Sequence, residues 1–121
     1  MIVHLKRFRF DAVPSPGGDG PSLLAYRARK LGHHVDFALR DLRLGPLGVV
    51  AARGPDAQAA FDLFAVTYHA GSCGFGHYTS AVRHGLTQRW HLFDDEEVEP
   101  LEPARVPSER AYLLFFGRRA T

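Results

Sequence analysis

Short runs of β-branched and aromatic residues, each bounded by glycine, proline or a polar turn, set the strongest limit on how this chain folds. Residues 61–68, 77–82, 89–93 and 111–116 form four such runs. The chain has 12 glycines and 8 prolines, and most of them cluster between the runs. Strands separated by frequent turns are typical of hairpin-connected sheets. The sequence therefore predicts a mainly antiparallel sheet, with the densely apolar run 111–116 in a central position.

The first half of the chain is less regular. Residues 2–10 have the composition of a buried strand, and basic residues alternating with apolar ones give it a polar face. Residues 14–21 form a loop, residues 22–31 favour strand and loop over a short helix, and residues 45–58 form a second flexible stretch. Since strand-like sequence begins at the second residue, we expect the chain to be part of a longer protein or a shortened product of it.

Length, charge and cysteine content narrow the class of protein. A chain of 121 residues is a normal size for one domain. Its net charge of +2, with scattered basic residues, does not indicate a nucleic-acid partner. It holds no apolar run near the roughly twenty residues that a membrane helix needs. A single cysteine, Cys73, excludes an intrachain disulfide and fits a reducing compartment.

A histidine and an aspartate lie near the open end of one expected hairpin. A turn centred near Gly85 places His77 opposite Asp94, and a shift of one residue substitutes Asp95. Directly opposed residues have Cβ atoms about 5 Å apart, which permits an imidazole–carboxylate hydrogen bond. Such a carboxylate fixes the tautomer of a histidine that acts as a general base. The alternative on spacing alone is an exposed histidine beside an acidic turn.

Other candidate residues give weaker signals. Cys73 lies in a glycine-rich loop four residues before His77, yet no helix N-terminus is evident to activate its thiol. We interpret it as a loop cysteine, and a substitute nucleophile is the alternative. His77, His84 and His91 lie on different limbs of the hairpin and no Cys-x-x-Cys pair exists, so we expect no metal. His69 ends the strand before the loop, where it either supports a site or is a partly buried structural residue.

Six ordered segments resemble the C-terminal half of the catalytic domain of ubiquitin-specific proteases, the papain-like cysteine deubiquitinases. They are His-Leu-Lys-Arg-Phe (4–8), Val-Asp-Phe-Ala-Leu with Asp-Leu (35–39 and 41–42), Asp-Leu-Phe-Ala-Val (62–66), Gly-Phe-Gly-His-Tyr-Thr (74–79), Trp-His-Leu-Phe-Asp-Asp (90–95) and Ala-Tyr-Leu-Leu-Phe-Phe (111–116). The resemblance implies an α+β, β-dominated fold: the antiparallel palm-like sheet of such a peptidase without its helical thumb half. Residues 1–121 would then be the C-terminal part of a catalytic domain.

The resemblance also implies roles for individual residues. His77 would be the catalytic base, Asp94 its orienting partner and Asp95 a possible helper. The glycine loop would clamp the ubiquitin tail, and the residues implied for substrate binding are Gly74, Phe75, Gly76, Tyr78 and His69. Aromatic and backbone walls would suit the narrow Gly-Gly end of that tail and exclude bulkier sequences. Phe75 stands where the family usually has glycine, and it would narrow the loop beside His77.

Two departures from the family pattern limit what this chain would do alone. The family's cysteine nucleophile lies in an upstream Asn-x-Gly-Asn-Thr-Cys-Tyr-like segment that has no counterpart here, and the zinc-binding Cys-x-x-Cys pairs are missing too. The expected function is thiol-dependent ubiquitin hydrolysis, with ubiquitin and ubiquitinated proteins as partners and the missing half supplying the thiol. No cofactor, nucleic acid or membrane is implied, and the expected location is cytoplasmic or nuclear. The alternative is an inactive fragment that binds ubiquitin or another partner.

Overall fold

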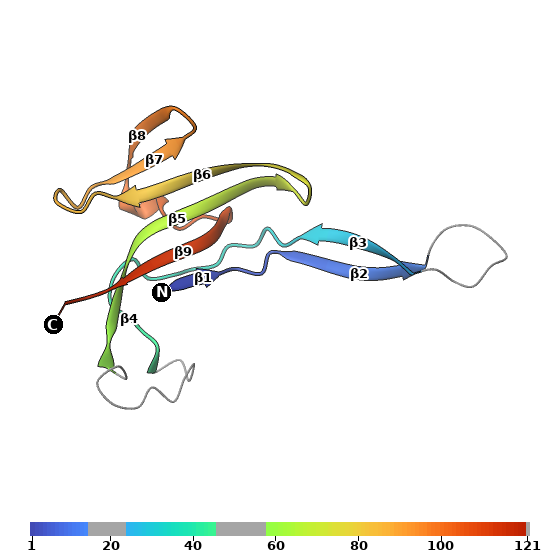
Figure 1. Ribbon diagram of the computed structural model, residues 1–121, viewed down its shortest axis with the longest axis horizontal. Coiled ribbons are helices and arrows are strands. Elements are labelled where there is room, and N and C mark those ends of the chain that lie inside the picture. The colour runs from blue at the N-terminus through green and yellow to red at the C-terminus, as the bar shows by residue number, and fades with distance from the viewer. Residues whose placement is uncertain (15–23, 46–57, 121) are drawn as a thin grey trace.

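A computed structural model describes residues 1–14, 24–45 and 58–120, and a seven-stranded antiparallel sheet forms the body of the protein (Figure 1). Six strands follow one another in the order β1 (Ile2–His4), β9 (Ala111–Arg118), β5 (Ala60–Ser72), β6 (Phe75–Arg83), β7 (Trp90–Asp94) and β8 (Glu97–Leu101). A short β4 (Leu42–Arg43) pairs with the beginning of β5. The described residues contain no α-helix. The predicted β-dominated, antiparallel class is confirmed.

Beside this body, β2 (Phe8–Pro14) and β3 (Leu24–Lys30) form a separate two-stranded ribbon that projects from the sheet (Figure 1). The prediction of strand within residues 22–31 is confirmed by β3. The prediction of one buried strand over residues 2–10 is wrong, because the chain leaves the main sheet after His4 and enters the ribbon at Phe8.

The inward-turned side chain of Arg7 explains why the chain breaks between β1 and β2. Its side chain turns inward and is only 3% exposed, so it does not belong to a polar strand face. The guanidinium Nε donates to the Ala111 carbonyl at 2.5 Å, and one terminal nitrogen donates to the carbonyls of Leu31 and His33 at 2.9 and 2.8 Å. Arg7 thereby ties the base of the ribbon to β9, and burial lowers its pKa from the ordinary arginine value.

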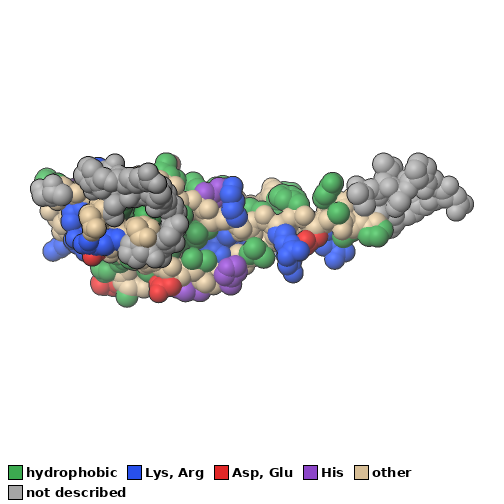
Figure 2. Space-filling view, turned by 90° about the horizontal axis from the view of Figure 1, so that it is seen from below, with side chains coloured by type: hydrophobic (Ala, Val, Ile, Leu, Met, Phe, Trp, Pro, Cys, Tyr) green, Lys and Arg blue, Asp and Glu red, His purple; other side chains and the backbone are tan. Residues whose placement is uncertain are grey.

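The two faces of the ribbon differ in chemistry. Alternation along paired strands puts Phe10 and Tyr26 on one face, where they are 60% and 69% exposed. Arg9 and Arg29 are direct partners on the other face, where Arg9 also pairs with Asp11. Figure 2 shows Lys and Arg side chains gathered along the ribbon. The ribbon is thus amphipathic.

The hydrophobic core lies against one face of the main sheet. Alternate residues of the central strands point into it, which is why apolar residues recur there with a period of two. Tyr68 takes part in this core, and its hydroxyl donates to the buried Val106 carbonyl at 2.6 Å. Burial raises the pKa of Tyr68 to about 12. The buried set comprises Leu63, Val66, Tyr68, Ala81, Trp90, Leu101, Val106, Ala111, Leu114 and Phe116.

The strand β9 lies between β1 and β5, so the prediction that 111–116 is an inner strand is confirmed. Pro100 does not interrupt regular structure. It lies within β8, at the edge of the sheet, where a missing N–H breaks no hydrogen-bond ladder on the outer side. Glu97 and Glu99 precede it on the same strand and are exposed.

Most of the predicted loop at 14–21 and the flexible stretch at 45–58 lie outside the described residues. Among the residues that are described, no helix is long and apolar enough to cross a membrane.

Candidate active site

The predicted glycine-rich loop around Cys73 is a tight turn between β5 and β6. Strand pairing continues to Ser72 and Phe75, which leaves only Cys73 and Gly74 at the tip. Gly71 and Gly74 have φ angles of 108° and 94°, a backbone region that glycine enters without strain. The two strands therefore extend well beyond the sheet body and carry the segment that contains His77.

The register between β6 and β7 differs from the predicted one by two residues. Ser80 pairs with Phe93 and Ala81 with Leu92, so continuing this register sets Asp94 opposite Thr79 rather than opposite His77. Because side chains alternate between faces, a shift of two residues keeps His77 and Asp94 on the same face as diagonal neighbours. The long imidazole bridges the added distance.

His77 and Asp94 form a direct contact despite that shift. The distance from His77 Nε2 to Asp94 Oδ1 is 2.5 Å, and each side chain is 50% exposed. The hydrogen bond and charge of Asp94 raise the pKa of His77 above its ordinary value, and Asp95 adds a smaller effect of the same sign. Since Nε2 is engaged by the carboxylate, Nδ1 is the ring nitrogen left for another group.

Asp95 occupies the turn between β7 and β8 with a φ of 49°, a left-handed conformation that aspartate tolerates better than most residues. Ligand atoms of His77, Asp94 and Asp95 lie within 4.8 Å of one another, so these three residues are a group that can approach a cation. All three side chains are exposed. No buried ligand or supporting partner marks a metal centre there, and the absence of a metal remains a prediction.

His69 lies on the other face of the hairpin and is buried, with 4% of its surface exposed. Its ring packs against those of Phe8 and Tyr78, with centroids 5.5 and 4.8 Å away. Burial, followed by the nearby Lys30 charge, lowers the pKa of His69. The structure thus places this predicted substrate-binding residue beneath the backbone of the site.

The contact between Lys30 and His69 was missed by sequence reasoning. The Lys30 ammonium lies 2.9 Å from His69 Nδ1 and donates to the His69 carbonyl at 2.8 Å. These residues are 39 positions apart and belong to the ribbon and the main sheet. No local motif connects them, so only the fold brings them together.

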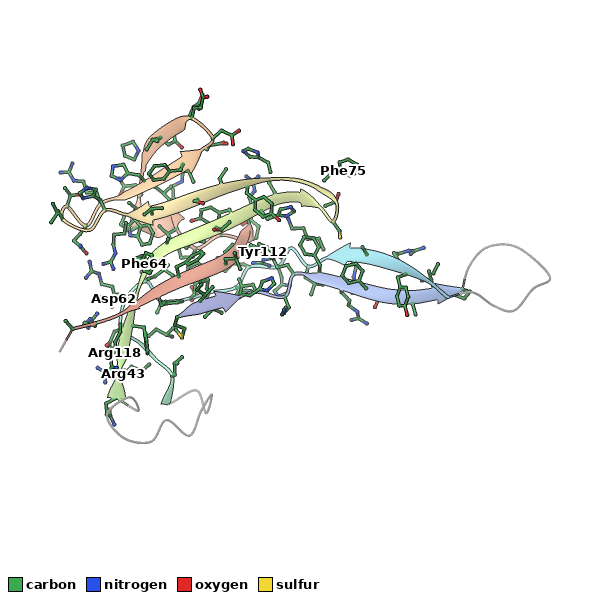
Figure 3. The ribbon with its side chains drawn as sticks, viewed as in Figure 1. Arg43, Asp62, Phe64, Phe75, Tyr112 and Arg118 are labelled. Carbon is green, nitrogen blue, oxygen red and sulfur yellow. The ribbon has the colours of Figure 1, made fainter. Side chains whose placement is uncertain are left out.

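Two aromatic side chains of the hairpin face solvent. Phe75 is 85% exposed at the tip, away from the body of the sheet, and Tyr78 is 55% exposed (Figure 3). Phe75 therefore does not close over His77 in this structure. Cys73 is exposed in the turn. It lies three residues beyond Ala70, the partner of His77, which is about 10 Å along an extended backbone.

The fold and the His–Asp pair agree with a family match that spans residues 1–116: the chain belongs to the ubiquitin carboxyl-terminal hydrolase family. It is 34% identical over 116 residues to human ubiquitin carboxyl-terminal hydrolase 2, covering 96% of this chain and 16% of that protein. It is 31% identical over 118 residues to ubiquitin carboxyl-terminal hydrolase 8 of Arabidopsis thaliana, covering 98% of this chain and 12% of that protein. The chain thus spans a small part of these relatives.

Solved structures give the same assignment. The SAGA DUB module of Ubp8, Sgf11, Sus1 and Sgf73 matches with a TM-score of 0.74 and 25% sequence identity, over 98% of this chain and 23% of the matched chain. The same module bound to monoubiquitin matches equally well, with a TM-score of 0.74 and 25% identity over 98% of this chain and 23% of the matched one. The chain therefore belongs to a deubiquitinase family and shares the fold of the matched part of these structures.

Proposed function

We propose that this chain supplies the general base and its orienting carboxylate to a thiol-dependent ubiquitinyl hydrolase that cleaves after the C-terminal glycine of ubiquitin. The observation that carries the proposal is the 2.5 Å contact between His77 Nε2 and Asp94 Oδ1. Residues 1–121 would form the C-terminal part of the catalytic domain, and the cysteine nucleophile would come from the part that the family places upstream.

The geometry suits base catalysis at Nδ1. Asp94 holds Nε2–H, so the neutral ring presents Nδ1 as an acceptor for a thiol proton. The raised pKa of His77 favours the imidazolium that forms when the thiol loses its proton. The thiolate then attacks the carbonyl carbon after the last glycine, and the imidazolium returns the proton to the departing lysine amine. Water, activated by the same ring, releases ubiquitin from the thioester.

The β5–β6 hairpin is the proposed contact for the ubiquitin tail. Gly74 faces open space at the tip, Gly76 is exposed on the side away from His69, and Tyr78 and Phe75 present exposed rings nearby. A peptide ending in two glycines can approach such a backbone more closely than one with side chains. The match to a DUB module bound to monoubiquitin supports ubiquitin as the ligand. Asp95 would assist by its charge.

A chimera tests the catalytic role. Residues 1–116 replace the matching segment of human ubiquitin carboxyl-terminal hydrolase 2, and hydrolysis of ubiquitin carrying a fluorogenic C-terminal amide is measured. His77→Ala should lower kcat/KM by about 10³-fold or more, and Asp94→Asn by at least about 10²-fold. His34→Ala is the control, since His34 is an exposed histidine outside the site. Full activity of a folded His77→Ala chimera would refute the assignment.

A second candidate function is non-catalytic binding of ubiquitin. It is favoured by Cys73 being the chain's one cysteine and lying too far along the turn to serve His77. Titrating the 121-residue chain with labelled ubiquitin distinguishes the two candidates. Binding together with an inactive, folded chimera would favour the binding module, whereas an active chimera that depends on His77 favours the enzyme. A chemistry that needs a reduced thiol agrees with a cytoplasmic or nuclear location.

A further inference from the structure

Beneath the site, on the face of the sheet opposite the His77 side chain, lies a polar contact buried among aromatic rings. His69 of β5 is 4% exposed there, and its ring centroid is 4.8 Å from that of Tyr78 and 6.1 Å from that of Tyr112. A buried imidazole needs hydrogen-bond partners, because an unpaired polar group in such a place is costly. The proposed hydrolysis does not use this ring, so its role needs another explanation.

Lys30, the last residue of β3, supplies the partner. Its ammonium lies 2.9 Å from His69 Nδ1 and 2.8 Å from the carbonyl oxygen of the same residue. An ammonium can only donate, so Nδ1 accepts and the proton of the neutral ring is on Nε2. Two hydrogen bonds from one ammonium to one residue fix both the backbone and the ring of His69.

The Nε2 end of the fixed ring occupies the space beside Gly76. A Cβ added at Gly76 would lie 2.1 Å from His69 Nε2 and 2.8 Å from Cε1, so ring and backbone are packed without room for a methyl group. Gly76 directly precedes His77. The imidazole that Lys30 holds therefore supports the strand backbone immediately before the proposed base.

We propose that His69, gripped by Lys30, is a positioning residue that holds the β6 backbone at Gly76 so that His77 meets Asp94. The catalytic meaning of this role rests on the proposed function, whereas the mechanical link does not. The link also joins the projecting ribbon to the active-site hairpin, since Lys30 belongs to the ribbon and pairs with Phe8. A change near Lys30, where the ribbon meets the main sheet, would therefore alter the geometry of His77, the proposed general base.

The charges near Lys30 and His77 determine which direction of change in the His77 pKa would support the proposal. Burial, followed by the nearby charges of Arg7 and Arg110, lowers the pKa of Lys30. The charges that act on His77 are those of Asp94 and Asp95. If Lys30 influenced His77 only through its charge, removing that cation would raise the pKa of His77. If Lys30 positions the backbone, its removal loosens the contact with Asp94, and the pKa of His77 falls.

The experiment is an NMR titration of the histidines in the 121-residue chain. Lys30→Met should shift the midpoint of His77 down toward the ordinary histidine value of about 6.5 and speed amide exchange at Gly76 and His77. Arg29→Met is the matched control: it removes one cation from the adjacent residue, on the opposite face of the ribbon. It should leave the His77 midpoint unchanged.

A second measurement needs no variant. Nitrogen shifts of His69 in the unmodified chain should show a neutral ring with its proton on Nε2 across the range in which His77 titrates. A His69 that carries its proton on Nδ1, or that titrates near 6.5, overturns the proposal. So does a folded Lys30→Met chain in which the His77 midpoint stays or rises. Because neither readout requires cleavage, an inactive chimera with a lowered His77 midpoint would reject the function and keep the positioning role.

Discussion

Two other glycines, Gly74 at the tip of the β5–β6 hairpin and Gly85 in the β6–β7 turn, allow the packing at Gly76 to be tested against matched controls. At Gly76 an added Cβ meets His69 Nε2 at 2.1 Å and the Ala70 carbonyl oxygen at 2.7 Å, and both obstacles are held in place. Gly76→Ala should therefore lower the free energy of unfolding by about 3 kcal/mol, the upper end of the usual cost of overpacking. Gly74→Ala meets open space and strains only a φ of 94°, for about 1–2 kcal/mol. Gly85→Ala meets neither and should stay within about 0.5 kcal/mol.

Urea unfolding followed by tryptophan fluorescence measures these costs. Trp90 is the single tryptophan and is 5% exposed, so its emission reports opening of the core. The slope with denaturant should stay constant across the three variants, so that differences in midpoint give differences in stability.

A second background identifies the obstacle at Gly76. In a His69→Ala chain the two ring atoms nearest the added Cβ are gone and the Ala70 carbonyl stays, so the cost of Gly76→Ala should fall by about 1 kcal/mol or more. Equal costs in both backgrounds, or a Gly76→Ala variant as stable as Gly85→Ala, would show that the imidazole does not lie beneath this backbone.

Three further outcomes follow from the contacts. Tyr68→Phe removes a buried hydrogen bond and should cost about 1–2 kcal/mol in the same urea assay, and an absorbance titration should place the Tyr68 pKa at about 12. A hydrogen bond from Arg119 lowers the pKa of Asp62, so the Arg119–Asp62 pair stabilises the fold above pH ~4. This stabilisation is lost as the pH falls through the lowered pKa. Asp62→Asn should therefore make the free energy of unfolding less dependent on pH in this acidic range. Asp94→Asn should lower the titration midpoint of His77 measured by NMR. It should also remove the stabilisation by the charged His77–Asp94 pair, which is present below pH ~6.5 and is lost as the pH rises through the raised His77 pKa.

The strand pattern predicted much of the main sheet because β5, β6, β7 and β8 pair with neighbours that directly precede or follow them in the chain. Residues 61–68, 77–82 and 111–116 fall within β5, β6 and β9, and the run 89–93 overlaps β7 (Trp90–Asp94) except at Arg89. Period-two alternation and turn residues are local signals, and they suffice where hairpins connect consecutive strands. The last strand, β9, lies between β1 and β5. Its dense apolar composition predicted this inner position.

The break in the N-terminal segment could not be predicted from local pattern. Arginine usually lies at the surface, yet Arg7 is buried. Its guanidinium donates hydrogen bonds to the carbonyl groups of Leu31, His33 and Ala111. Those acceptors come from distant segments, so the sequence gives no sign that an arginine turns inward there.

The contact between His77 and Asp94 was predicted correctly, although the strand register was not. The hairpin was expected with His77 directly opposite Asp94, and the strands are shifted by two residues. A shift by an even number keeps both side chains on one face, so the contact forms, whereas a shift by one residue would have separated them. The catalytic roles of His77, Asp94 and Asp95 remain predictions.

The edge strand β8 has a consequence for how molecules of this protein meet one another. Open sheet edges invite strands from other chains, which is a common start of aggregation. β8 counters this with Pro100, which offers no amide hydrogen, and with Glu97 and Glu99, which repel an approaching copy. The hairpin that carries Asp94 can therefore stay open to solvent and to an incoming substrate without recruiting a second sheet.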